Sequence, residues 1–90
     1  MKSICIRVIG RVQGVGFRAG VAQEAYKLGL NGFVRNEPNG SVYIEIEGDP
    51  EVLDNFLQWC HQGPRFAKVD QVIVEECAVK NFSDFEIHRF

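Results

Sequence analysis

The sequence has few cysteines, and their arrangement gives no sign of a disulfide framework. Its 90 residues contain three, Cys5, Cys60 and Cys77, with no Cys-x-x-Cys pair. An odd number of widely separated cysteines argues against a disulfide scaffold and is typical of a reducing compartment. Arg7 also interrupts the first apolar run before it reaches the roughly seven residues of a secretory leader. We therefore expect a cytoplasmic protein, with Cys5 and Cys60 as small buried hydrophobic residues.

Long apolar runs and clustered histidines are also missing. No uncharged apolar run approaches the ~18 residues of a membrane-spanning helix, so we expect no membrane partner. The two histidines, His61 and His88, lie far apart in the chain. No spacing of His, Cys or carboxylate residues resembles a zinc site. The sequence therefore predicts no bound metal, with His61 near the end of a helix and His88 on an edge strand.

An excess of positive charge is absent as well. Ten Lys and Arg residues against twelve Asp and Glu residues give a net charge of −2, which argues against binding to nucleic acid. The charge is uneven, because residues 1–45 hold six bases and three acids and the remainder holds four bases and nine acids. A small anion would bind in the first half, although chance at a solvated surface explains the asymmetry equally well.

The remaining composition is that of a folded protein. Hydrophobic residues make up 46% of the chain and charged residues 24%, which is far from the composition of disordered chains. A chain of this length has room for one hydrophobic core. We therefore expect a single domain over residues 1–90, and nothing in the sequence demands a partner subunit, so we expect a monomer.

The first third of the chain predicts a strand, a loop and a helix. Apolar residues at every second position indicate a strand over residues 4–9. Val21, Ala25 and Leu28 recur at helical spacing, and Gly29 is typical of the residue that ends a helix. A glycine-bearing loop joins these two elements.

A hairpin is expected next. Its strands would cover residues 32–37 and 42–47, with Asn39 and Gly40 between them. An Asn-Gly pair commonly supplies the positive φ angles of a two-residue hairpin turn. In the second strand apolar residues alternate with polar ones, so we expect its polar face, including Glu47, to lie in water.

The second half predicts another helix and two strands. Asp49 and Pro50 are typical of a helix start, and Gly63 follows the last apolar residue of the stripe. Strands are expected over residues 69–75 and around 85–87. The order is therefore β-α-β-β-α-β with a short extra C-terminal strand. Such an order predicts an α+β, ferredoxin-like two-layer sandwich, with two helices on one face of a mostly antiparallel sheet.

The loop before the first helix has the features of an anion site. Gly14 and Gly16 allow successive backbone N–H groups to converge near a helix N-terminus, where the dipole is positive. Arg18 adds a planar set of donors that matches a phosphoryl group. A tight turn followed by a solvated arginine explains the same residues equally well. The spacing fits neither a nucleotide P-loop nor the Gly-x-Gly-x-x-Gly fingerprint, so we expect no ATP, NAD or other cofactor.

Two stretches resemble the sequence signatures of the acylphosphatase family. The first is VIGRVQGVGFR at residues 8–18. The second is GFVRN at residues 32–36, followed by GSV at 40–42 and by Gly48. A looser third match is GPRFAKV at residues 63–69. The chain is therefore similar to acylphosphatases over nearly its whole length, and its predicted element order agrees with that family.

The resemblance implies metal-independent hydrolysis of the carboxyl–phosphate mixed anhydride of small acyl phosphates, giving a carboxylate and inorganic phosphate. The catalytic residues it implies are Arg18, which grips the phosphate, and Asn36, which holds the attacking water. Positioning and charge neutralisation are what phosphoryl transfer mainly needs from a protein, and an amide can both donate to and accept from water. The phosphate-binding residues it implies are Gln13, Gly14, Val15, Gly16, Phe17 and Arg18.

Two features leave alternatives open. An asparagine near a hairpin is by itself more often a turn or edge residue, and only the matched signature favours the water-holding role of Asn36. The chain also departs from the family at Phe33, Ala19 and Gly20, which we expect to affect the acyl-group pocket. Gly20 is also expected to weaken the first helical turn by about 1 kcal/mol relative to alanine.

Two functional hypotheses follow. The first is an enzyme that hydrolyses acyl phosphates. The second is a non-catalytic module that holds phosphate or an acyl phosphate in the same loop, as a domain of a larger carbamoyl-transferring maturation protein would. The presence of both Arg18 and Asn36 in a short chain favours the enzyme.

Overall fold

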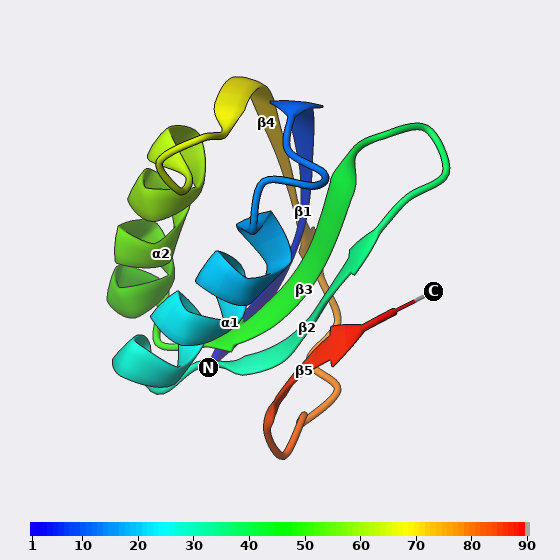
Figure 1. Cartoon of the computed structure of the whole chain (residues 1–90). Helices are drawn as coiled ribbons and strands as arrows, with labels where there is room; N and C mark the ends of the chain where they lie inside the picture. The colour runs from blue at the N-terminus through cyan, green and yellow to red at the C-terminus, as the bar shows by residue number, and fades with distance from the viewer. Residues whose placement is uncertain (90) are drawn as a thin grey trace.

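A computed structural model describes residues 1–89 of the chain. Neighbouring strands are antiparallel, except for β2 and β5, and the strand order in the sheet is β4-β1-β3-β2-β5. Both helices lie on one face of the sheet (Figure 1). The predicted α+β, ferredoxin-like two-layer fold with a short C-terminal strand is therefore confirmed. The elements in chain order are β1 (Lys2–Arg11), α1 (Phe17–Leu28), β2 (Asn31–Asn36), β3 (Val42–Gly48), α2 (Pro50–Gln62), β4 (Lys68–Cys77) and β5 (Phe85–His88).

The core lies between the helices and the sheet. Alternate residues of β1 and β3, including Ile6 and Ile44, are fully buried on the helix-facing side. Val21 of α1 and Phe56 of α2 are buried against them. Full burial of one such side chain stabilises the fold by about 1.5–3 kcal/mol. This packing fixes the start of α1 relative to the ends of β1 and β2.

The turn between β2 and β3 differs from the prediction. Gly40 has a φ of 92°, but Asn39 is not in the left-handed region. The Glu37 N–H donates to the Ser41 carbonyl, and the Gly40 N–H donates to the Glu37 carbonyl. These bonds close a three-residue loop, so the predicted two-residue turn is wrong. Pro38 explains the difference, because its fixed negative φ suits the first position of a type I turn that ends with glycine in the left-handed region.

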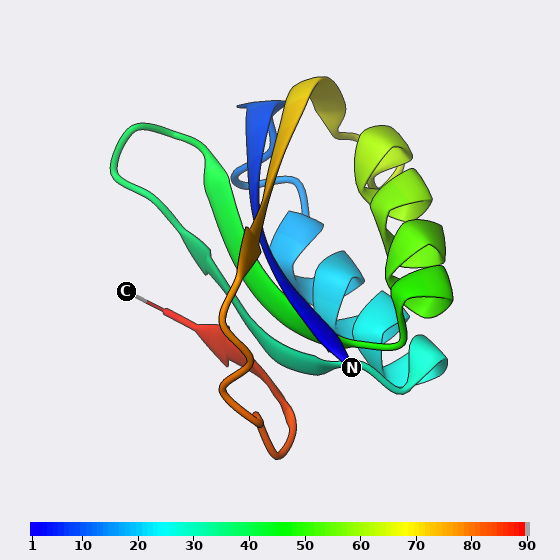
Figure 2. The ribbon, with the colours of Figure 1, turned by 180° about the vertical axis from the view of Figure 1, so that it is seen from behind.

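One glutamate expected in water is buried. Glu47 is only 3% exposed, and its carboxylate accepts hydrogen bonds from the main-chain N–H groups of Lys80 and Phe82. Both donors belong to the connection between β4 and β5. This connection crosses the sheet on the face opposite the helices (Figure 2). The expectation of a fully solvated polar face was wrong here, because strand periodicity does not indicate where a loop returns.

Replacing Glu47 by glutamine should lower the free energy of unfolding by about 2 kcal/mol or more. The amide has a single oxygen for the two N–H groups, and its NH₂ group would face one of them. Urea denaturation of the variant measures the change. Glu76→Gln is a matched control, because this 73% exposed side chain makes only a 3.8 Å ion pair with Lys2. Equal stability of the two variants would contradict the buried role of Glu47.

The histidine predictions are confirmed, and the cysteine predictions are confirmed in part. His61 lies near the end of α2, and His88 lies on β5 at the sheet edge. Cys60 is buried in the core as expected. Cys5 is only half-buried, because it points to the uncovered face of the sheet beside Cys77, and the expectation of a core residue was wrong. All three cysteines are free thiols.

Candidate active site

The loop between β1 and α1 presents uncapped main-chain N–H groups. Gly14 and Gly16 have φ angles of 74° and 79°, which alternate with negative φ at Val15 and Phe17. Gly16 is the N-cap of α1, and no side chain caps this helix end. Alternating backbone conformations of this kind form an anion-binding nest, and the helix dipole adds partial positive charge. The two glycines are required here because other residues adopt positive φ at a cost.

Gln13 attaches this loop to the β2–β3 turn. Its Nε2 atom donates to the carbonyl oxygens of Glu37 at 2.8 Å and Ser41 at 2.9 Å. The loop is therefore fixed relative to the end of β2, where Asn36 lies. The Gln13 side chain positions the loop and does not point into the site.

Phe17 fixes the start of α1 from inside the core. It is 1% exposed, and its ring lies 5.5 Å from that of Trp59. A Cβ atom on Gly63 would come within 2.8 Å of the Phe17 ring, and one on Gly20 would lie 3.0 Å from Trp59. Gly63, the first residue of the third matched signature, is therefore needed to leave room for the Phe17 ring. Gly20 allows α2 to approach closely, which offsets the propensity loss expected there.

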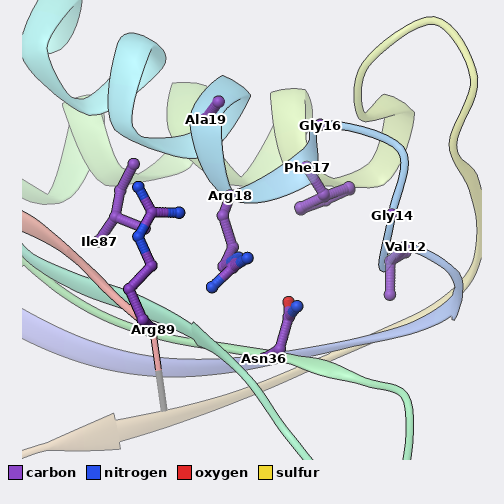
Figure 3. A pocket seen from close by; sticks show the side chains of 9 residues that line it. All are labelled: Val12, Gly14, Gly16, Phe17, Arg18, Ala19, Asn36, Ile87 and Arg89. Atoms are coloured by element: carbon purple, nitrogen blue, oxygen red, sulfur yellow. The ribbon is translucent and has the colours of Figure 1, made fainter.

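A cavity of about 240 Å³ opens between this loop, the start of α1 and the ends of β2 and β5. The side chains of Arg18 and Asn36 point toward each other across it (Figure 3). The structure therefore brings together most of the predicted site residues, whereas Gln13 and Val15 do not line the cavity. The lining residues are Val12, Gly14, Gly16, Phe17, Arg18, Ala19, Asn36, Ile87 and Arg89.

The cavity is electropositive. Arg18 and Arg89 both line it, and none of its lining residues is acidic. Arg18 Nη1 donates to the His88 carbonyl oxygen at 3.1 Å, which fixes the guanidinium and leaves its other N–H groups for a ligand. Together with the N-terminus of α1, these cations form an environment suited to a phosphoryl group.

Asn36 supplies an acceptor that no described residue uses. It is the last residue of β2, and its buried Oδ1 atom accepts no hydrogen bond from residues 1–89. A buried acceptor left without a donor costs about 1–3 kcal/mol. Such groups occur at functional sites, where water or a ligand supplies the donor.

Three lining residues, Arg89, Ile87 and Val12, were missed by sequence reasoning. Arg89 and Ile87 come from the C-terminal end of the chain, and only the parallel pairing of β5 with β2 brings them here. Val12 lies inside the first signature, but as a buried residue it carried no chemical signal. Ala19, which was expected to affect the acyl-group pocket, does line this cavity. Phe33, expected at the acyl-group pocket, does not line this cavity. Strand periodicity places it on the other face, where its ring stacks 4.5 Å from that of His88.

Comparison with known proteins decides the family. A family model described as Acylphosphatase matches residues 4–87. The chain belongs to the acylphosphatase family. The acylphosphatase of Methylococcus capsulatus is 47% identical to it over 90 residues, which cover 99% of this chain and 98% of that protein. The prediction of an acylphosphatase enzyme that acts on small acyl phosphates is therefore confirmed.

Solved structures of acylphosphatases have the same fold. The acylphosphatase from Bacillus subtilis superimposes with a TM-score of 0.95 at 39% identity, covering 98% of this chain and 99% of that one. A structure of full-length HypF in the phosphate- and nucleotide-bound form matches with a TM-score of 0.88 at 33% identity. That match covers 97% of this chain but 12% of HypF. The acylphosphatase fold therefore also occurs as part of a much larger protein.

Proposed function

We propose that this acylphosphatase binds the phosphate of its substrate with residues 13–18 and with Arg18, and positions the attacking water with Asn36. The observation that carries the proposal is the placement of Arg18 and Asn36 on opposite sides of one electropositive cavity at the N-terminus of α1. The phosphate-binding residues would be Gln13, Gly14, Val15, Gly16, Phe17 and Arg18, those without cavity-lining side chains acting through main-chain N–H groups.

Phosphate binding would proceed by charge neutralisation. The phosphoryl oxygens would accept hydrogen bonds from the nest around Gly14 and Gly16 and from the guanidinium of Arg18. Negative charge spread over these oxygens in the transition state would strengthen the same bonds, and the donors are already in place because Gln13 and Phe17 hold the loop. In many enzymes, preorganised donors of this kind make the largest contribution to the rate enhancement.

Hydrolysis would then need one oriented water. The Asn36 Oδ1 atom, which accepts no hydrogen bond from residues 1–89, would accept one from water and direct the water oxygen at phosphorus. The new P–O bond forms as the bond between phosphorus and the acyl oxygen breaks, and the carboxylate leaves with the electron pair. The water proton passes to a phosphate oxygen. A carboxylate leaves without protonation, so this route needs no acid–base residue and no metal.

A second candidate is a non-catalytic module that holds phosphate or an acyl phosphate. The acylphosphatases that match this chain over 98% and 99% of their own length favour the enzyme instead. The two candidates share the same phosphate site, so binding alone does not separate them. Turnover does.

No helix among residues 1–89 has the length and apolar character needed to cross a bilayer. We further propose that residues 1–90 form one domain and act as a cytoplasmic monomer without nucleic-acid or membrane partners. The net charge of −2, with acids in excess, supports the absence of a polyanionic partner.

Purified protein should release phosphate rapidly from benzoyl phosphate in excess EDTA. Phosphate release over time measures the activity. The Cys60→Ala variant is the control and should keep this activity, because Cys60 lies in the core and does not line the cavity. Activity that is abolished by EDTA and restored by a divalent metal would overturn the metal-free mechanism. A folded protein that binds inorganic phosphate without turnover would instead favour the binding module.

A further inference from the structure

Three metal-ligating side chains meet on the face of the sheet that no helix covers. They are Cys5 on β1, Cys77 on β4 and Glu45 on β3, and their sulfur and carboxylate oxygen atoms all lie within 4.8 Å of one another. Cys5 is directly opposite Glu45 in the antiparallel register, and Cys77, opposite Ser3, is one diagonal step away. All three side chains are half-buried. Three neighbouring strands thus each supply one ligand to the same point.

The spacing suits a tetrahedral ion. Zinc binds thiolate sulfur at about 2.3 Å and carboxylate oxygen at about 2.0–2.2 Å, so two sulfur ligands of one zinc lie about 3.8 Å apart. Ligand atoms already within 4.8 Å reach these positions by small side-chain rotations. Two thiolates with a carboxylate are a ligand set that zinc accepts.

A disulfide fits the same cysteines less well. Cys5 and Cys77 are diagonal neighbours across β1 and β4. Diagonal Cα atoms in an antiparallel sheet are about 7–8 Å apart. Disulfides need Cα separations of about 4.4–6.8 Å. A bridging ion spans the larger gap without movement of the backbone.

We propose that Cys5, Cys77 and Glu45 form a zinc-binding site, with water as the fourth ligand. A cavity of about 270 Å³ borders Cys5, so solvent reaches this ligand directly. Glu75, directly opposite Cys5, and Arg7 both line that cavity.

Lys80 forms an ion pair with the Glu45 carboxylate. Its Nζ atom lies 2.7 Å from Glu45, which also accepts from the Tyr43 hydroxyl at 2.8 Å. Burial alone would raise the pKa of Glu45, but the hydrogen bonds from Lys80 and Tyr43 outweigh it and lower that pKa. The Lys80 side chain is 49% exposed, so an incoming ion displaces it into solvent.

Zinc bound here would join β3, β1 and β4 on the face opposite the catalytic cavity. Residues of β1 alternate between faces, with Cys5 on the uncovered face and its neighbours Ile4 and Ile6 buried against the helices. The site would therefore stabilise the sheet without taking part in hydrolysis. Removal of zinc by EDTA should leave the basal rate of phosphate release unchanged.

Titration of the reduced protein with Co²⁺ and then Zn²⁺ tests the proposal. One Co²⁺ per chain should produce thiolate-to-metal charge-transfer absorption, and Zn²⁺ should abolish it. Zinc at about 100-fold above its dissociation constant should raise the midpoint of thermal unfolding by roughly 10 °C or more. Protons should be released as the thiols bind the metal, so affinity falls with falling pH.

Single variants separate this site from adventitious binding. Cys5→Ser and Cys77→Ser should each lose the absorption and weaken zinc binding by about 100-fold or more, whereas Cys60→Ala should keep both. Lys80→Gln should bind zinc more tightly, because the competing ammonium is gone. Unchanged zinc affinity in Cys5→Ser would overturn the proposal. So would a protein whose two thiols form a disulfide in air and show no metal-dependent absorption.

Discussion

Replacing Arg18 by alanine should weaken phosphate binding and hydrolysis together. The guanidinium is fixed by its 3.1 Å hydrogen bond to the His88 carbonyl and faces a cavity whose described lining residues include no acid. An arginine that stabilises a transferring phosphoryl group contributes about 10³-fold or more to turnover. We therefore expect kcat/KM for benzoyl phosphate to fall by about 10³-fold, and the inhibition constant of inorganic phosphate to rise.

Two further variants test whether the loss of activity is specific to the Arg18 guanidinium. Arg18→Lys keeps a positive charge but not the planar arrangement of donors, so it should recover only part of the activity. Arg65→Ala removes an exposed arginine outside the cavity and should leave kcat/KM unchanged. Full activity in Arg18→Ala would mean that Arg89 and the helix N-terminus suffice, and the proposed role of Arg18 would be wrong.

The sequence predicted the parts of the site that are close together along the chain. The strand–glycine loop–helix pattern of residues 8–18 depends on local rules, because positive φ at Gly14 and Gly16 and the polarity of a helix end are properties of neighbouring residues. Asn36 was found only through the matched signature. Its own type and position favoured a turn or edge residue.

What the sequence did not predict depends on contacts between distant segments. Arg89 reaches the cavity because β5 pairs in parallel with β2, and a four-residue strand carries little information about its partner. Glu47 is buried because the connection after β4 returns to it, and Cys5 meets Cys77 through the register of β1 and β4. Periodicity assigns a residue to a face of the sheet but does not say what covers that face.

Replacing Asn36 by alanine should separate turnover from binding. Loss of one positioned hydrogen-bonding group at the reacting centre costs about 10²-fold or more in kcat. In the proposed mechanism the loop around Gly14 and Gly16 and the Arg18 side chain hold the phosphate, and the substitution does not touch them. We therefore expect kcat for benzoyl phosphate to fall by at least that factor, while the inhibition constant of inorganic phosphate stays within about two-fold of the parent value.

The stability of the same variant distinguishes a water-holding residue from a structural one. If Asn36 were a turn or edge residue, alanine would remove a hydrogen bond and lower the free energy of unfolding by about 1 kcal/mol. Because its Oδ1 atom is buried without a donor among residues 1–89, alanine instead removes an unsatisfied acceptor. We expect urea denaturation to show unchanged or increased stability together with the lost turnover, as is typical of residues kept for function at a cost in stability. Lower stability with normal turnover would assign Asn36 to the fold and leave the attacking water without its proposed partner.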